Sequence, residues 1–190
     1  NNIRLAQYST EDEIAKVLKR IRSGGPFRNV LVELLSERHA VYIDRPAYQA
    51  NRIRGYAMAS FADVGLPDSA VNFVLDELQN SRNAYMVAAA ARALRGCKRP
   101  RAEYAFFLIQ AVLNLRNYDD SLDLTVYKPS WPLQHPSSGR LEVFYTLQWM
   151  RGYAKAILPE LNTFLNNTIV FAPDLQAEIQ KTIKLIEADN

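Results

Sequence analysis

Hydrophobic residues recur along most of the chain at the 3.6-residue spacing of amphipathic helices. The first stripe consists of Ile14, Val17, Leu18 and Ile21. Thr10 precedes this stripe and Glu13 follows three positions later, which is the spacing of a capping box. The stripe ends at the turn-forming run Ser23-Gly24-Gly25-Pro26. The pattern therefore predicts a capped helix near the N-terminus.

Similar stripes predict helices as far as the C-terminus. The expected helices are 27–34, 46–64, 71–78, 84–94, 104–115, 141–156, 159–165 and 173–186. Residues 39–43 are expected to form an extended link, and Gly65 is expected to take a left-handed backbone at a helix end. Segment 84–94 is alanine-rich with two apolar faces, and 104–115 is apolar nearly all round. Both helices should therefore be central and enclosed by neighbours.

Two of the expected helical hairpins repeat each other in sequence. Residues 57–61 align with 90–94 at a shift of 33, and Leu78 aligns with Val112 at a shift of 34. A third copy is expected near residues 141–165. Because a hairpin with two apolar faces is not stable alone, these units are expected to stack on one another.

The segment 53–115 resembles HEAT-like repeats in their short form, mainly through the alanine-rich run 87–96. Asp76 and Arg92 are loose candidates for the Asp and Arg positions that such repeats carry. The resemblance implies an all-α fold, an α-α superhelix of stacked antiparallel helical hairpins with a concave surface. It implies protein binding and no catalytic residues.

We expect a single HEAT-like helical domain over residues 1–190. Its expected parts are an N-terminal helical pair and link (1–45), two repeats (46–116), an inserted loop (117–139), and a C-terminal repeat with a capping helix (140–190). The inserted loop holds three prolines, and long loops inside compact domains are often functional. Trp131 in this loop either plugs the stack of helices or presents an anchor to a partner.

Composition narrows the classes of protein to consider. With 48% hydrophobic residues and only 7 Gly and 9 Pro in 190, the chain is neither disordered nor a turn-rich β protein. Cys97 is the only cysteine, which excludes an internal disulfide and a cysteine-built zinc site. No apolar run approaches the roughly 18 residues of a membrane helix. We expect a soluble protein, either cytoplasmic or exported with its signal removed, and Asn1 indicates a processed chain or part of a longer one.

The net charge of +3 is modest, but basic residues gather at one expected helix end. This cluster consists of Arg92, Arg95, Lys98, Arg99 and Arg101. It is a candidate site for phosphate or for an acidic protein. The alternative is a solvated turn whose positive charges favour the C-terminal end of a helix.

Aromatic residues recur every four positions in the expected helix 141–156. The stripe consists of Tyr145, Trp149 and Tyr153. Beside basic neighbours, such a stripe could stack nucleic-acid bases, or it could fill the core. Alkylpurine DNA glycosylases with HEAT-like repeats use tryptophans and an aspartate on a concave surface. Trp149 and Trp131 are the tryptophans available here, and no aspartate lies near Trp149 in sequence.

Three acidic residues resemble the DDxxD magnesium motif of prenyl-diphosphate enzymes. They are Asp119, Asp120 and Asp123. Because the chain has no second motif of that kind, we expect Asp119 and Asp120 to cap a helical turn or to line a solvated loop. His39 and His135 fall in expected loops, and no Gly-x-Ser-x-Gly elbow presents a nucleophile. No metal and no cofactor are therefore expected.

The sequence thus predicts a non-catalytic interaction or scaffold module whose partner is another protein or another domain of the same chain. The alternative is a nucleic-acid-binding or base-excision protein of the same architecture. A more distant alternative is a magnesium-dependent enzyme that uses the Asp119 motif. No membrane span is expected in any of these cases.

Overall fold

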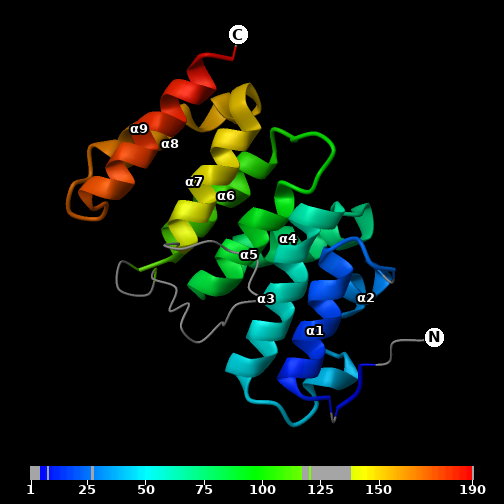
Figure 1. Ribbon diagram of the computed structural model, residues 1–190. Coiled ribbons are helices and arrows are strands. Elements are labelled where there is room, and N and C mark those ends of the chain that lie inside the picture. Colours follow the sequence, from blue (N-terminus) through cyan, green and yellow to red (C-terminus); the bar gives the residue numbers. More distant parts are fainter. Residues whose placement is uncertain (1–4, 8, 27, 117–119, 121–137, 190) are drawn as a thin grey trace.

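The computed structural model describes residues 5–7, 9–26, 28–116, 120 and 138–189 (Figure 1). The described chain is all-α, as predicted. Its α-helices are α1 (Glu11–Arg22), α2 (Arg28–Glu33), α3 (Ala47–Val64), α4 (Asp68–Asn80), α5 (Ala84–Leu94), α6 (Tyr104–Asn114), α7 (Gly139–Met150), α8 (Leu158–Leu165) and α9 (Pro173–Glu187). Short 3₁₀ segments, η1 (Ala40–Tyr42) and η3 (Arg151–Ile157), lie between them.

Alternate helices form one row. In the order α1, α3, α5, α7 and α9, each helix packs against the next, and Figure 1 shows them following one another from the blue to the red end of the chain. The helices of this row run parallel. Arg52 and Glu11 pair near the starts of α3 and α1, and Arg22 approaches Asp63 to 3.9 Å near the ends of the same two helices. Helices α4 and α6 pack side by side, and they cover α5 and α7 respectively.

Close packing of this row depends on two glycines. A Cβ atom on Gly96 would lie 2.1 Å from the carbonyl oxygen of Phe61, and one on Gly55 would lie 2.3 Å from the ring of Tyr85. Gly96 also accepts a hydrogen bond of 2.9 Å from the amide of Leu66. The turn after α5 is therefore fixed against the turn after α3.

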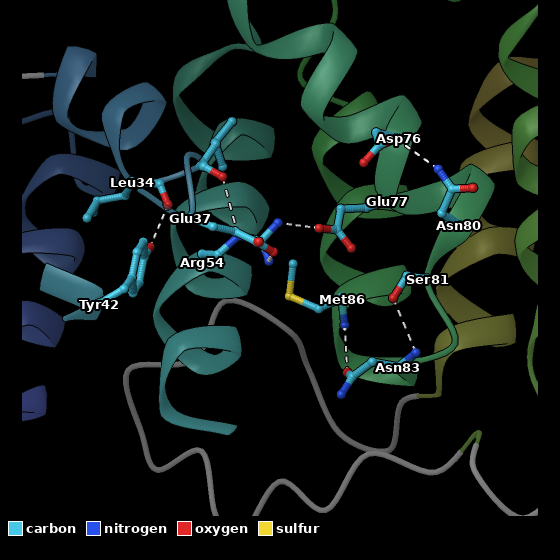
Figure 2. A network of polar contacts seen from close by, with 11 residues as sticks. Leu34, Glu37, Tyr42, Arg54, Asp76, Glu77, Asn80, Ser81, Asn83 and Met86 are labelled. Atoms are coloured by element: carbon cyan, nitrogen blue, oxygen red, sulfur yellow. Dashed lines mark hydrogen bonds and ion pairs between the residues drawn. The ribbon is translucent and has the colours of Figure 1, made fainter. Parts of the chain in front are cut away.

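A buried arginine joins α3 to the segments on both sides of it (Figure 2). Arg54 donates to the carbonyl oxygen of Leu35 at 3.3 Å and to the carboxylate of Glu37 at 2.9 Å. It also forms an ion pair with Glu77 on α4. Because burial of an unpaired charge is costly, these acceptors are what allow a guanidinium to lie here.

Two local predictions are wrong. Residues 39–43 do not form an extended link, because Nδ1 of His39 accepts a hydrogen bond from the amide of Val41 and begins the 3₁₀ turn η1. The expected helix 141–156 ends at Met150, since Arg151 has a positive φ of 52° and the chain continues as η3. The next amide, that of Gly152, is held by the side chain of Asp189 at 2.9 Å. Both departures depend on hydrogen bonds that hydrophobic spacing does not reveal.

The N-terminal prediction is confirmed. Thr10 and Glu13 form both hydrogen bonds of a capping box at the start of α1. The backbone and side-chain hydrogen bonds from Thr10 lower the pKa of Glu13. Gly65 has the positive φ expected of it, 92°.

Within the described residues, no helix combines the length and apolar character required to span a membrane.

Candidate interaction surface

The outer face of α4 and α6 carries large apolar side chains that do not pack into the core. Helices α4 and α6 lie side by side and run in the same direction. Near their starts, Arg101 lies 3.9 Å from Asp68, and near their ends the side-chain amide of Asn114 donates to the carbonyl oxygen of Gln79 at 2.9 Å. The two helices thus present one continuous face. We call it the α4/α6 face.

Large apolar side chains are exposed on the α4/α6 face. Phe106 and Leu113 on α6 are 54% and 60% exposed. Phe73 on α4 is 39% exposed, but it lies four residues before Glu77, which pairs with Arg54 of α3, so it stands on the α3 side of α4 and apart from them. Phe106 and Leu113 are seven residues apart, or two helical turns, so they lie on the same side of α6. Helix α6 contains no charged residue, although part of its surface faces solvent. Aromatic residues are enriched, and charged residues depleted, at the centre of protein interfaces.

This finding corrects the expectation that helix 104–115 is fully enclosed. Its buried side is formed by Tyr104, Ala105, Leu108, Ile109, Ala111 and Val112. Phe106 and Leu113 point elsewhere, because only one side of α6 contacts α4, α7 and η3. The signal was visible in the sequence. A helix that is apolar nearly all round has either a covering layer or a partner, and hydrophobic spacing does not distinguish the two.

The basic cluster divides into paired and unpaired residues. Arg92 lies 3.5 Å from Asp63, which also faces Arg22 from α1. Arg95 forms an ion pair with the buried Glu142 of α7. Burial lowers the pKa of the Arg95 guanidinium, and the charge of Glu142 opposes this shift. Arg92 and Arg95 therefore join helices of the row, and both are mostly buried.

The other three members of the cluster lie in the turn between α5 and α6. Lys98, Arg99 and Arg101 are exposed, and we call residues 98–101 the basic turn. Arg101 has the distant, exposed carboxylate of Asp68 at 3.9 Å, an arrangement that contributes little binding energy. Within the described part of the chain, no ion pair engages Lys98 or Arg99.

The aromatic stripe is divided by the end of α7. Tyr145 and Trp149 lie on α7 and are partly buried, and Trp149 packs against the hydrophobic core. Tyr153 lies on η3 and is 49% exposed. Burial raises the pKa of Tyr145, with smaller contributions from Glu178 and Glu142. The stripe therefore does not continue as one helical face from Tyr145 to Tyr153.

Asp120 is a structural residue. Its side chain is buried, and its carboxylate accepts a hydrogen bond of 2.8 Å from the backbone amide of Arg140 at the start of α7. Burial raises the pKa of Asp120, and the hydrogen bond from Arg140 counteracts this effect. Arg140 itself donates to the carbonyl oxygen of Leu115. The N-cap of α7 is Ser138, and Asp120 adds a second acceptor in the first turn of that helix, so Asp120 lies in no solvated loop and supports a helix that begins far along the chain.

Several candidates fall outside the described residues. They are Asp119, Asp123, Trp131 and His135. In the described ranges, His, Cys, Asp and Glu side chains form no group of three that could hold a metal ion.

Cys97 is half-buried, and burial raises the pKa of its thiol. Asp76, the candidate for a repeat-family Asp, is exposed and accepts a hydrogen bond from Asn80 at 2.8 Å.

Comparison with known proteins finds no match: no family model, no curated protein and no solved structure is similar to this chain.

Proposed function

We propose that this chain is a non-catalytic protein-interaction module of the HEAT-like, α-solenoid type, which binds its partner through the α4/α6 face. The observation that carries the proposal is the exposure of Phe106 and Leu113 on α6, a helix that lacks any charged residue. The parallel row α1, α3, α5, α7 and α9 supports the solenoid assignment, because stacked hairpins place their first helices in such a row.

The free energy gained by burying the exposed apolar side chains sets a lower limit on the size of the partner surface. Burying a large apolar side chain completely contributes about 1.5–3 kcal/mol, so the two half-exposed ones on α6 supply on the order of 2 kcal/mol. Association costs at least about 4 kcal/mol in lost translational and rotational freedom. A stable complex must therefore also cover the polar residues around the apolar ones. They are Asn72, Gln79, Gln110 and Asn114.

Site-specific photocrosslinking tests the proposal. A benzoyl-phenylalanine placed at position 106 should give a discrete crosslinked product in the cells that make the protein. The same group at Lys184, an exposed position on α9, is the matched control. We expect the product at position 106 to disappear with excess wild-type chain and with Leu113→Ser. Equal crosslinking from both positions would overturn the proposal, and circular dichroism checks that each variant is folded.

Nucleic-acid binding is a second candidate, which the exposed cations Lys98 and Arg99 favour. Electrostatic binding to phosphates weakens as the salt concentration rises. For each phosphate that the protein neutralises, the plot of log K against log salt concentration falls with a slope of roughly 0.9. Fluorescence anisotropy with a labelled duplex and a labelled single strand, at about 50 mM and about 200 mM salt, measures this slope. Salt-sensitive binding that Arg99→Glu removes would support this candidate. The partly buried positions of Arg92 and Arg95 argue against a wider phosphate-binding surface.

A further inference from the structure

The basic turn lies at one end of the α4/α6 face. The turn directly precedes α6, and the contact between Arg101 and Asp68 places it beside the start of α4 as well. Phe106 stands on the first turn of α6. Cations and exposed apolar side chains are therefore continuous on one surface, with the cations at the N-terminal end of both helices.

The charges around this surface are unevenly distributed. Three exposed cations, Lys98, Arg99 and Arg101, outnumber Asp68 and Glu103 at the same end of the helices. The N-terminal ends of α4 and α6 add partial positive charge from the helix dipoles. Further along α4, Asp76 is exposed on the same face. A ligand that carries its negative charge at one end is therefore attracted to the basic turn. A ligand with negative charge along its middle would be repelled by Asp76 on α4.

The basic turn is also held in place. The carbonyl oxygen of Gly96 accepts from Leu66, and the amide of Cys97 donates to the carbonyl oxygen of Leu94 at 3.0 Å. At the other end of the turn, the amide of Tyr104 donates to the carbonyl oxygen of Arg101 at 3.0 Å. A turn anchored on both sides loses little conformational freedom when it binds, so its cations are presented with a low entropic cost.

We propose that the partner segment is an acidic amphipathic helix, which covers Phe106 and Leu113 with its apolar side and places its acidic end on the basic turn. This inference rests on the proposed function. The distance from Phe106 to Leu113 along α6 is about 10 Å, which equals two turns of a helix. Apolar residues at positions i, i+3 or i+4, and i+7 of the partner match it.

A designed peptide tests the inference. The probe is an 18-residue helix-forming peptide with Leu at the i, i+4 and i+7 positions, Gln elsewhere, and four Glu at one end; a control peptide carries four Lys instead. Binding to the full chain is measured by fluorescence anisotropy at about 50 mM salt. We expect the acidic peptide alone to bind. The double variant Lys98→Glu/Arg99→Glu should weaken its binding about tenfold, since two exposed charge pairs are reversed.

A second charge-reversal variant controls for net charge. Lys19 and Arg20 are an adjacent, exposed Lys-Arg pair at the end of α1, so Lys19→Glu/Arg20→Glu changes the net charge equally at another place. We expect this variant to bind the acidic peptide within about twofold of wild type. Equal weakening by both double variants would overturn the inference, because binding would then follow net charge alone.

The remaining outcomes separate this inference from the proposed function. If both peptides bind equally and Phe106→Ser/Leu113→Ser abolishes binding, the acidic partner is wrong and the interaction face stands. If neither peptide binds, the inference is overturned, and crosslinking at position 106 decides the proposed function independently. Tighter binding of duplex DNA that Lys98→Glu/Arg99→Glu removes would overturn it in favour of nucleic acid. A dimer in sedimentation that Phe106→Ser dissociates would identify a second copy as the occupant and would also overturn it.

Discussion

The ion pair between Arg54 and Glu77 should stabilise the fold far more than the pair between Arg54 and Glu37. Both carboxylates bind the same buried guanidinium (Figure 2). The side chain of Glu77 is only 13% exposed, whereas that of Glu37 is 77% exposed. Glu37→Gln is thus a matched control for Glu77→Gln, with the same chemical change and the same partner.

Glu77→Gln should lower the free energy of unfolding by about 3 kcal/mol. Breaking a buried ion pair costs roughly 3–5 kcal/mol when the remaining charge stays buried without compensation. Arg54 keeps the carbonyl oxygen of Leu35 and the carboxylate of Glu37 as acceptors, and Gln retains another, so the loss lies at the lower end. For a chain of this size the melting temperature should fall by about 6–12 °C. Glu37→Gln should cost less than about 1 kcal/mol, as exposed pairs do.

Urea denaturation followed by circular dichroism measures both variants, and a third tests the mechanism. In Arg54→Met/Glu77→Met the buried charges are removed together, so the double variant should be less destabilised than Glu77→Gln. Equal losses from Glu37→Gln and Glu77→Gln would refute the reasoning. So would a double variant at least as destabilised as Glu77→Gln, since removing both buried charges together would then bring no relief.

Three further predictions concern stability. Gly96→Ala should cost about 1–3 kcal/mol, because its Cβ would meet the carbonyl oxygen of Phe61; an unchanged melting temperature would contradict the close approach. Thr10→Ala should cost about 1 kcal/mol through the lost N-cap, and a wild-type urea midpoint would contradict this. Burial raises the pKa of Tyr104 to about 12 from its ordinary 10.0, so the neutral form stabilises the fold below pH 10 and this contribution is lost as pH rises towards 12. Tyr104→Phe should make the alkaline loss of stability shallower, and an unchanged pH profile would contradict it.

Most helices of this fold could be predicted because their signals are local. The stripe around Ile14, the capping residue Thr10 and the turn at Gly65 each depend on residues a few positions apart, and each is found as expected. The break at Arg151 could not be predicted in the same way. It coincides with the hydrogen bond between Gly152 and Asp189, 37 residues further along the chain. Such long-range hydrogen bonds are not visible in the spacing of hydrophobic residues.

The candidate surface was only partly predictable for a related reason. The cluster from Arg92 to Arg101 is contiguous in sequence, but its members differ in their partners, since Glu142 comes from α7 and Asp63 from α3. Only the packing of the row shows which cations remain exposed. The exposure of Phe106 could not be predicted from the sequence, because a helical stripe does not show how many neighbours a helix has. The missing charge on α6 was the available signal.

The same contacts that make the row rigid also determine where the exposed cations lie. Arg95 is held by Glu142, and Gly96 is held by Leu66 and packed on Phe61, so the chain leaves α5 in one fixed direction. Lys98 and Arg99 follow immediately and therefore keep a constant position relative to the first turn of α6. A variant such as Gly96→Ala should thus weaken binding of the acidic peptide even while the protein remains folded, because the basic turn would shift with the backbone. Unchanged peptide affinity in folded Gly96→Ala would show that the cations act through general charge and not through a fixed position.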